Sequence, residues 1–185
     1  MAFRTSMTAI VEVVRVLVND PHDTAAMFSD LVIQDVLDQY ATVAVYEVLT
    51  PVENITSDGT MQYKMFTSVH TYWEEFTTSG SVVDGDYDVL SPATSNYQTG
   101  VWTFSATQNL PVLVYGTFYD INGAAAELWE RKASKYADRF DFTADGSSYT
   151  RSQLVKHALD MASKYRGQSP RSQGTGYLTR SDVMQ

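Results

Sequence analysis

The sequence predicts an α+β fold: a four-helix domain made of two helical hairpins, with a small antiparallel β-sheet or barrel inserted between them and a flexible C-terminal tail. Near both ends of the chain, apolar residues recur at three- and four-residue steps, which is the helical period. In the middle they alternate instead, and Gly, Asp and Pro mark frequent turns. We therefore expect helical parts at 1–41 and 120–167, a β-rich subdomain at 42–119, and a tail at 168–185.

The clearest helical pattern is a hairpin near the C-terminal end. Its first helix is predicted over about 122–140, with Asp120 or Asn122 as the N-cap. Its second helix begins at a capping box formed by Thr150 and Gln153. The residues expected on the buried faces are Ala125, Leu128, Trp129, Lys132, Ala133, Tyr136, Phe140, Leu154, Ala158, Met161, Ala162 and Tyr165.

The N-terminal part predicts two shorter helices. One covers 7–18, and the other begins after Ser29, whose hydroxyl is placed to cap it. In the middle of the chain we interpret 51–55 as a connection. Strands are expected at 42–49, 61–66, 70–77, 87–90, 101–104 and 112–119, a number and length typical of a small antiparallel sheet or barrel.

Composition excludes several classes of function. The 185 residues contain no cysteine, so a thiolate nucleophile or thiolate metal site is excluded. No apolar run approaches the roughly 20 residues of a membrane helix, and the first residues lack the pattern of a signal peptide, so we expect synthesis and use in the cytoplasm. Residues 1–119 carry 3 Lys+Arg and 14 Asp+Glu, whereas residues 120–185 carry 10 and 8. An acidic chain of this kind is not expected to bind nucleic acid tightly by itself.

No residue pattern predicts catalysis. The nucleophile, phosphate-loop and dinucleotide motifs are absent, and the three histidines lack a metal-ligand spacing. Asp84, Asp86 and Asp88 alternate and could bind calcium, but Val89 and Ser95 stand where a calcium loop needs glycine and glutamate, so a solvated turn is the simpler interpretation. We expect no enzyme, no catalytic residue, no cofactor and no metal.

Basic residues on the hairpin are candidates for a partner interface. Arg131, Lys135 and Arg139 recur every four residues, which makes a stripe that could face DNA or an acidic partner. The alternative is a solvated face partly balanced by Glu127. Arg151 lies in the first turn of the last helix, where a cation opposes the helix dipole, so a carboxylate of a neighbouring chain could compensate it.

Aromatic residues on the predicted strands allow a different kind of site. They could form a platform that binds sugars, although such residues on alternating positions more often form the core and cross-strand pairs. These residues are Trp73, Trp102, Phe104, Tyr115, Phe118 and Tyr119.

A series of short motifs runs along nearly the whole chain in a fixed order. The motifs are Val16–Pro21, Phe28-Ser29-Asp30, Pro51-Val52-Glu53, Tyr87-x-Val89-Leu90-x-Pro92, Trp102-x-Phe104, Gly116-x-Phe118-Tyr119-Asp120, Ala124-Ala125-Ala126, Phe140-Asp141-Phe142-x-Ala144-Asp145-Gly146, Tyr149-x-Arg151-Ser152-Gln153 and Tyr165-Arg166. This series resembles the head–tail connector (adaptor, or head-completion) proteins of tailed bacteriophages.

The resemblance implies a four-helix adaptor-type domain and a structural virion protein. Copies would form a homo-oligomeric ring, a dodecamer in this interpretation, at the phage neck, where the ring joins the portal to the tail and lines the DNA ejection channel. The implied partners are the portal protein, a head-closure (stopper) or tail-completion protein, and non-specifically the genomic DNA, with no membrane. Residues 168–185 would be the portal-docking arm. The implied interface residues are Arg131, Lys135, Arg139, Arg151, Gln153, Tyr165, Arg166, Arg171, Tyr177, Leu178 and Arg180.

Two alternatives stay open at this point. A head-closure or tail-completion ring protein would share the location in the virion, although such proteins tend to be β-barrels. A module that binds carbohydrate or a host surface would use exposed aromatic residues on the sheet.

Overall fold

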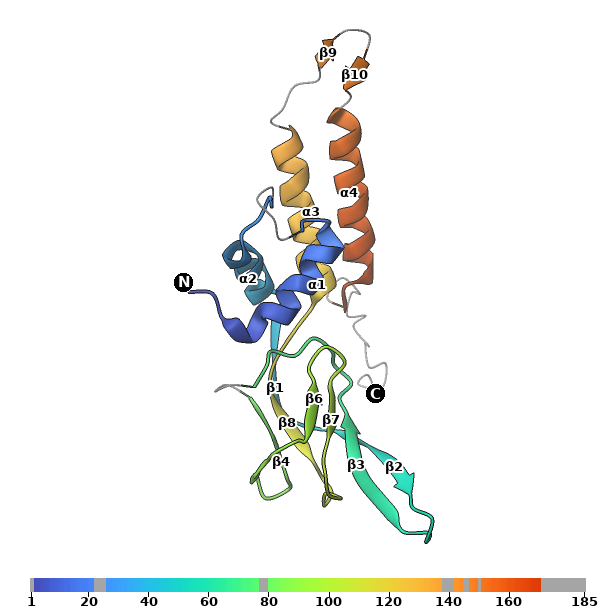
Figure 1. Ribbon diagram of the computed structural model, residues 1–185. Coiled ribbons are helices and arrows are strands. Elements are labelled where there is room, and N and C mark those ends of the chain that lie inside the picture. The colour runs from blue at the N-terminus through green and yellow to red at the C-terminus, as the bar shows by residue number, and fades with distance from the viewer. Residues whose placement is uncertain are drawn as a thin grey trace, which may run out of the picture.

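The computed structural model describes residues 2–21, 26–76, 80–137, 142–144, 147–149 and 151–170. Its described part contains four α-helices and two four-stranded antiparallel sheets, so the predicted α+β class is confirmed. The molecule is elongated, with the helices at one end and the two sheets at the other (Figure 1). The hairpin of α3 and α4 projects away from the sheets, and β9 and β10 pair at its tip.

All four predicted helices are present. A 3₁₀ turn (Thr5–Met7) leads into α1, and the side chain of Ser29 accepts a hydrogen bond from the Val32 N–H at the start of α2, as predicted. Asp120 Oδ1 accepts from the Gly123 N–H at 3.0 Å, which identifies Asp120 as the cap of α3. The helices are α1 (Thr8–Val18), α2 (Asp30–Gln39), α3 (Ile121–Ala137) and α4 (Arg151–Gln168); Thr150 and Phe140 lie outside the described residues.

Two sheets make up the β-rich end. The first has the order β1-β8-β4-β5 and the second has the order β2-β3-β7-β6. Only Leu49 separates β1 from β2, and a short link joins β5 to β6, so one chain segment closes each side of the two-sheet structure. The strands are β1 (Ala41–Val48), β2 (Thr50–Ile55), β3 (Met61–Thr67), β4 (Ser81–Val83), β5 (Val89–Leu90), β6 (Thr94–Asn96), β7 (Val101–Thr103), β8 (Leu113–Tyr119), β9 (Phe142–Ala144) and β10 (Ser147–Tyr149).

Two sequence predictions for the β-rich part were wrong. The stretch 51–55, interpreted as a connection, belongs to β2 and pairs with β3. The predicted strand 70–77 is irregular over its described residues: Trp73 makes one isolated bridge to Phe118, and Tyr72 has a positive φ of 59° that breaks the extended backbone. The aromatic residues Trp73 and Phe76 there pack into the core of the β-rich end from a loop. The three-residue strands β4 and β6 were missed because they are too short for a period to show.

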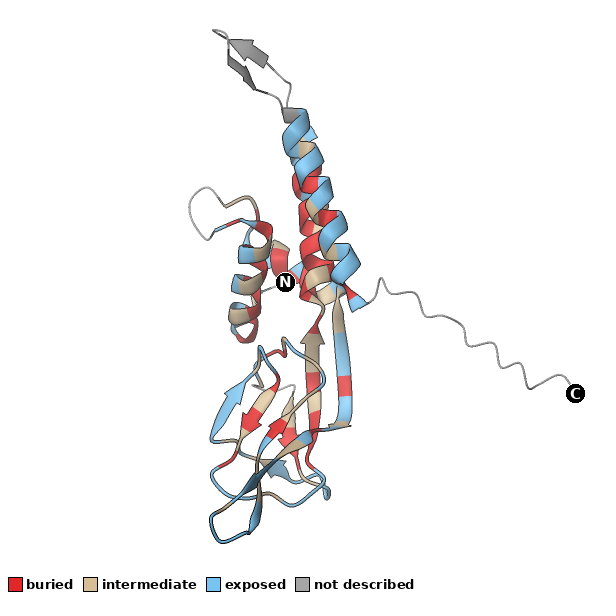
Figure 2. Cartoon of the chain, turned by 90° about the vertical axis from the view of Figure 1, so that its right-hand side faces the viewer, coloured by how far each residue is buried: buried red, intermediate tan, exposed pale blue. Residues whose placement is uncertain are grey.

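Each end of the molecule has its own core. The helical core combines residues from all four helices with Tyr119 at the end of β8. The core of the β-rich end centres on Trp73, Trp102 and Phe66, which are fully buried. Buried residues follow α3 and the inner strands, whereas α4 is mostly exposed (Figure 2). Of the residues predicted on the buried helical faces, Leu128, Trp129, Ala158 and Ala162 are among those that are buried as expected. The prediction was wrong for Leu154, which is 39% exposed because α4 packs on one side only, near Ala158 and Ala162.

One glycine shows how tightly the loop before β7 packs. Gly100 has a φ of +67°, and a Cβ at this position would lie 2.3 Å from the carbonyl oxygen of His70. Glycine is therefore required both for its backbone conformation and for the close approach of the two loops. This approach holds the loop that carries Trp73 against the second sheet, where the Ser68 N–H donates to the Gly100 carbonyl.

Candidate functional site

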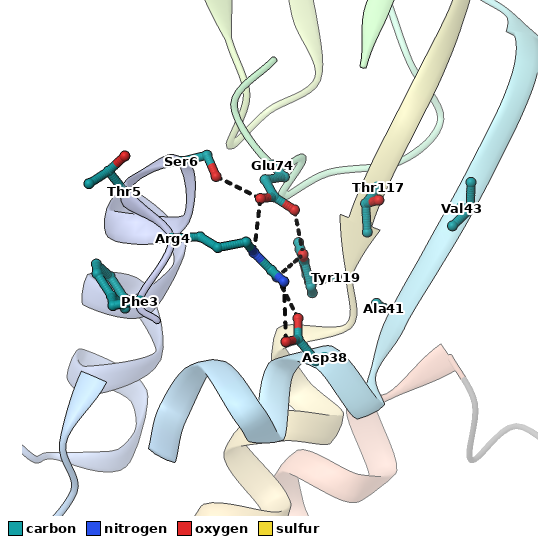
Figure 3. Close-up of a pocket in the computed structure, with 10 residues that line it drawn as sticks. All are labelled: Phe3, Arg4, Thr5, Ser6, Asp38, Ala41, Val43, Glu74, Thr117 and Tyr119. Carbon is teal, nitrogen blue, oxygen red and sulfur yellow. Dashed lines mark hydrogen bonds and ion pairs between the residues drawn. The ribbon is translucent and has the colours of Figure 1, made fainter. Parts of the chain in front are cut away.

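An open cleft lies where the two ends of the molecule meet (Figure 3). Its walls are the N-terminal segment, the end of α2, the loop before β4, and the upper parts of β1 and β8. The cleft has a volume of about 730 Å³. Its lining residues are Phe3, Arg4, Thr5, Ser6, Asp38, Ala41, Val43, Glu74, Thr117 and Tyr119.

A network centred on Arg4 forms the polar side of the cleft. Arg4 Nη2 lies 2.5 Å from Asp38 Oδ1 and donates to the Tyr119 hydroxyl at 3.0 Å, while Arg4 Nε lies 3.2 Å from Glu74 Oε1. The other oxygen of Glu74 accepts from the Tyr119 hydroxyl at 2.7 Å, and Ser6 donates to Oε1 at 2.6 Å. The network therefore joins α2, the N-terminal segment, β8 and the loop that also carries Trp73.

The protonation states in this network are well defined at neutral pH. Burial raises the pKa of Tyr119 well above its ordinary value, and the hydrogen bond to the Glu74 carboxylate raises it further. Burial acts to lower the pKa of Arg4, but the hydrogen bond to Asp38 and the negative groups around it outweigh this and raise it. Arg4 is thus a permanent cation and Tyr119 a permanent donor, so both carboxylates are held in place by fixed donors.

The chemistry of this cleft suits a structural role. Every oxygen of Glu74 and Asp38 already accepts from Arg4, Ser6 or Tyr119. Apolar or small side chains line the cleft on both sides of the charged group: Figure 3 shows Ala41 and Val43 on one side of it and Phe3 on the other. The cleft can therefore receive part of another chain segment beside the fixed polar network centred on Arg4. Among the described residues, no group of three His, Cys, Asp or Glu side chains could hold a metal ion.

A second buried charge cluster fixes the end of α1. Arg15 is 3% exposed and its guanidinium contacts the carboxylates of Asp20 and Asp30 as well as the Phe28 carbonyl. Lys132, on α3, donates to the Val18 and Asn19 carbonyls at 3.0 Å. Burial lowers the pKa of Lys132, and the charge of Asp20 opposes this shift. These contacts satisfy carbonyls that the end of a helix leaves without partners.

The basic residues predicted on α3 are used within the chain. Arg131 pairs with Glu127 one turn earlier, with Nε 3.1 Å from Oε1. Lys135 donates to the Met27 carbonyl at 2.8 Å, and its ammonium lies 4.5 Å from the centre of the Phe28 ring. This part of the predicted stripe therefore stabilises the fold. Arg139 lies outside the described residues.

Among the interface candidates on α4 and beyond it, the structure describes the side chains of Gln153, Tyr165 and Arg166. Gln153 is exposed, Tyr165 packs at the edge of the helical core, and Arg166 Nη2 lies 2.8 Å from Glu130 Oε1 of α3. The backbone of Arg151 begins α4, as predicted. The side chain of Arg151 and the residues Arg171, Tyr177, Leu178 and Arg180 lie outside the described residues.

The aromatic residues and aspartates proposed as other sites have structural roles. Trp73, Trp102, Phe104 and Tyr119 are at most 3% exposed and belong to the cores, so these four cannot offer a platform to a sugar. Asp84 Oδ1 accepts from the N–H groups of Asp86 and Asp88 at 3.0 and 2.9 Å, which makes a local turn. His70 stacks on Phe118 with its Nε2 3.2 Å from Glu47, and His157 contacts the edge of Trp129.

Sequence patterns do not join the cleft residues Arg4, Glu74 and Tyr119 into one site, and Tyr119 stands out only as part of the possible aromatic platform. One signal for them was available, because residues 1–119 contain only three basic residues among 14 acidic ones. Two of these cations, Arg4 and Arg15, contact two carboxylates each. A rare cation in an acidic segment is thus a better indicator of a structural charge cluster than a periodic stripe of cations.

Comparison of the chain with protein-family models, with curated proteins and with solved structures found no match. Within the described residues, none of the helices has the length and apolar character needed to cross a lipid bilayer.

Proposed function

We propose that this chain is a structural protein of a bacteriophage neck, an adaptor whose copies form a ring between the portal and the tail and surround the channel for DNA. The order of sequence motifs along the chain is the basis of this proposal. The α+β fold, with four helices and two antiparallel sheets among the described residues, is compatible with it. In this proposal the working residues are interface residues, and the virion neck is the location.

The observation that carries the proposal in the structure is the shape of the α3–α4 hairpin. α3 packs against α1 and α2 on one side and against α4 on the other, so α4 is an outer helix. Leu154 and Leu159 of α4 are 39% and 49% exposed. A projecting hairpin with an uncovered outer helix gives a subunit two different sides, and contacts between unlike sides generate a ring when the rotation from copy to copy closes.

The charge distribution supports a conduit for DNA. The chain has a net charge of −9, and Arg131, Lys132 and Lys135 of α3 contact groups within the subunit. Phosphates would therefore meet few free cations on this helix, and DNA binding driven by counterion release would be weak. A weakly binding wall lets DNA slide.

Light scattering of the purified protein, alone and mixed with the portal protein of the same virus, tests the proposal. We expect a ring, or a shift of the protein into the portal peak. Leu159→Asp should weaken the assembly because it places a carboxylate in the contact of the outer helix, whereas Val16→Asp on α1, at an apolar position that is 79% exposed, should not. A monomer that ignores the portal would overturn the proposal.

The docking arm is tested by truncation after Pro170. Ser169 is 3% exposed and bonds to Asp120, so the cut leaves this buried contact intact. We expect a folded protein with an unchanged melting temperature that no longer co-sediments with the portal. Unchanged co-sedimentation would show that residues 171–185 are not the arm.

One observation favours the second candidate function, a module that binds carbohydrate. Tyr46, Tyr87 and Tyr115 form an aromatic group on the outer face of the first sheet, with ring centres 4.8 and 5.4 Å apart. Tyr46 and Tyr87 are 43% and 60% exposed, and both have positive φ values of 52° and 68°. Strained exposed aromatic residues are found at binding sites. Glycan binding lost in Tyr87→Ala would favour this function over the ring.

A further inference from the structure

The outer face of the first sheet is apolar, whereas the outer face of an antiparallel sheet is usually polar. Val82 and Val114 belong to the core of the β-rich end, so the residues next to them along β4 and β8 point outward. One outward row runs through paired residues across all four strands of this sheet. The row consists of Val48, Leu113, Val83 and Val89.

The row and the tyrosine group beside it leave an apolar surface open to solvent. The two middle residues of the row are buried, but Val48 and Val89 at its ends are each 68% exposed. Tyr115 is the next outward residue on β8, and its ring contacts Tyr46, which in turn contacts Tyr87. An apolar patch of this kind indicates an interaction site rather than a solvated face.

The outer face of the second sheet is different. Its inward residues include the fully buried pair of Phe66 and Trp102. Four threonines are among the residues next to that pair on the outward side: Thr50, Thr67, Thr94 and Thr103. An apolar outer face is therefore a property of the first sheet and not of the whole β-rich end.

Helix α4 has an open side that could cover such a face. It packs on α3 near the buried residues Ala158 and Ala162, and most of its other side chains are exposed (Figure 2). Exposed residues at steps of four and three lie along one further side of the helix. These residues are Ser152, Lys156, Leu159 and Ser163, and we call them the open side of α4. A helix stacked on a sheet face is a standard pair of layers in proteins.

The charges of the two surfaces are complementary. Residues 41–119 carry eight acidic residues and one lysine, whereas residues 151–168 carry four Lys+Arg and one aspartate. Asp86 and Asp88, in the turn before β5, are exposed, and their carboxylates contact no cation among the described residues. Lys156 is exposed and forms no ion pair within the described part of the chain. Opposite charges of this kind fix the register of two surfaces and exclude wrong partners.

We propose that the outer face of the first sheet of one copy receives the open side of α4 of the next copy, with Leu159 on the apolar surface and Lys156 beside Asp86 and Asp88. The inference rests on the proposed ring, because it names the surface that α4 contacts there. The helices and the sheets are at opposite ends of the molecule (Figure 1), so the contact joins unlike surfaces of successive copies. The tyrosine group then serves assembly and not glycan binding.

Disulfide trapping between two chains tests the contact, because the natural sequence has no cysteine. One chain carries Val89→Cys, and the other, lengthened by a tag, carries Leu159→Cys. The matched control chain carries Asp160→Cys, at an exposed position about 100° further round α4. We expect Leu159→Cys to link at least about ten times faster than the control, because a disulfide needs Cα atoms within about 7 Å.

Scanning both surfaces distinguishes a defined contact from random collisions. Each scanned position on the open side has an exposed control one residue later. The three pairs are Ser152 and Gln153, Leu159 and Asp160, and Ser163 and Lys164. Val48→Cys probes the other end of the row, and Ile55→Cys, at a residue of the second sheet that is 65% exposed, is the control for the receiving face. Equal rates on the two sides of α4, or faster linking to Ile55→Cys, would overturn the proposal.

Charge reversal tests the placement of Lys156. Lys156→Glu in the α4 chain should slow trapping at least about threefold, because it brings like charges together. Asp86→Lys with Asp88→Lys in the receiving chain should restore the rate. Lys164→Glu, on another side of the same helix, should change it little. An unchanged rate in Lys156→Glu, or no recovery with the reversed aspartates, would overturn this placement.

The contact and the proposed neck function can fail separately. Light scattering first shows whether the chains assemble alone or only on the portal, and trapping is then carried out in the assembled state. An assembly in which the open side links no faster than its controls would overturn the contact and leave the ring. Fast trapping without any portal binding would support the contact and overturn the neck function. Chains that assemble in neither condition would overturn both.

Discussion

The helical end and the β-rich end of this molecule are stabilised by different means. The helical core is built mainly from aliphatic and alanine side chains, with Phe28, Tyr119 and Trp129 among them, and its buried cations Arg15 and Lys132 bind carbonyls at the end of α1. The β-rich core is built from aromatic rings, with Trp73 5.7 Å from Trp102 and 5.3 Å from Phe118 between ring centres. The helical core is formed by helix faces whose apolar residues recur at the helical period, whereas the core of the β-rich end depends on Trp73, which lies in a loop.

This difference shows which residues of each end cannot be substituted without loss of stability. A helix face tolerates change on its solvent side, because only every third or fourth residue is buried. The β-rich end depends on the loop of Trp73, whose indole N–H donates to the His70 carbonyl at 3.0 Å and whose ring contacts residues from both sheets. The Arg4 network lies between the two ends and binds Glu74, the residue after Trp73. The network therefore couples the loop to the helical frame.

The largest expected effect comes from removing one tryptophan from each core. Trp129→Ala and Trp73→Ala should each lower the free energy of unfolding by about 3–5 kcal/mol, because each leaves a large cavity and removes an indole hydrogen bond. Chemical denaturation followed by circular dichroism measures both. If the Arg4 network couples the two ends, both variants should shift a single common transition.

Two separate unfolding transitions would show that the Arg4 network does not couple the helical end to the β-rich end. In that case Trp129→Ala would move only the helical transition and Trp73→Ala only the other. A melting temperature within a degree of wild type for Trp129→Ala would show that Trp129 does not contribute to the core, despite its exposure of 4%.

Arg15→Ala should cost about 3 kcal/mol. It leaves the buried carboxylate of Asp20 without its cation, and an unpaired buried charge is strongly destabilising. Arg15→Lys should recover part of the loss, because one ammonium can replace the charge but not the whole fork of donors. Urea unfolding of the three proteins measures the effect, and equal stability of Arg15→Ala and wild type would mean that the cluster contributes nothing.

Tyr119→Phe probes the junction between the two ends. At neutral pH it should cost about 1.5–3 kcal/mol, because the Glu74 carboxylate loses a buried donor. The pKa of Tyr119 is raised by burial in the folded protein, whereas an unfolded tyrosine has a pKa near 10.0. Above that pH the unfolded chain loses the proton that the folded chain keeps, so the stabilising contribution present at lower pH is lost as pH rises.

The difference in unfolding free energy between wild type and Tyr119→Phe should therefore shrink above about pH 10. Denaturation at several pH values measures it, with Tyr87→Phe, at a tyrosine that is 60% exposed, as the matched control. A difference that stays constant up to pH 11 would show that Tyr119 is not protected by its burial.

The sequence predicted the helical end far better than the β-rich end. Long faces with a period of 3.6 residues, together with caps such as Ser29 and Asp120, located all four helices. The strand 70–77 failed because Trp73 and Phe76 pack into the core from a loop and make no regular strand pairing, and β4 and β6 have only three residues each. The Arg4 cleft was missed because its residues are up to 115 positions apart, so only the tertiary fold brings them together.

The smallest expected effect is that of Arg131→Ala on α3. The pair of Arg131 with Glu127 is exposed to solvent, and such pairs on a helix contribute about 0.3–0.5 kcal/mol. We expect the unfolding free energy to fall by no more than this and the effect to vanish at high salt, since screening weakens exposed ion pairs. Arg131 was predicted to face a partner, so its variant also separates the two roles of the α3 stripe. If Arg131→Ala abolishes portal binding while stability is unchanged, Arg131 belongs to the portal interface. If portal binding is unchanged, Arg131 serves only to stabilise α3.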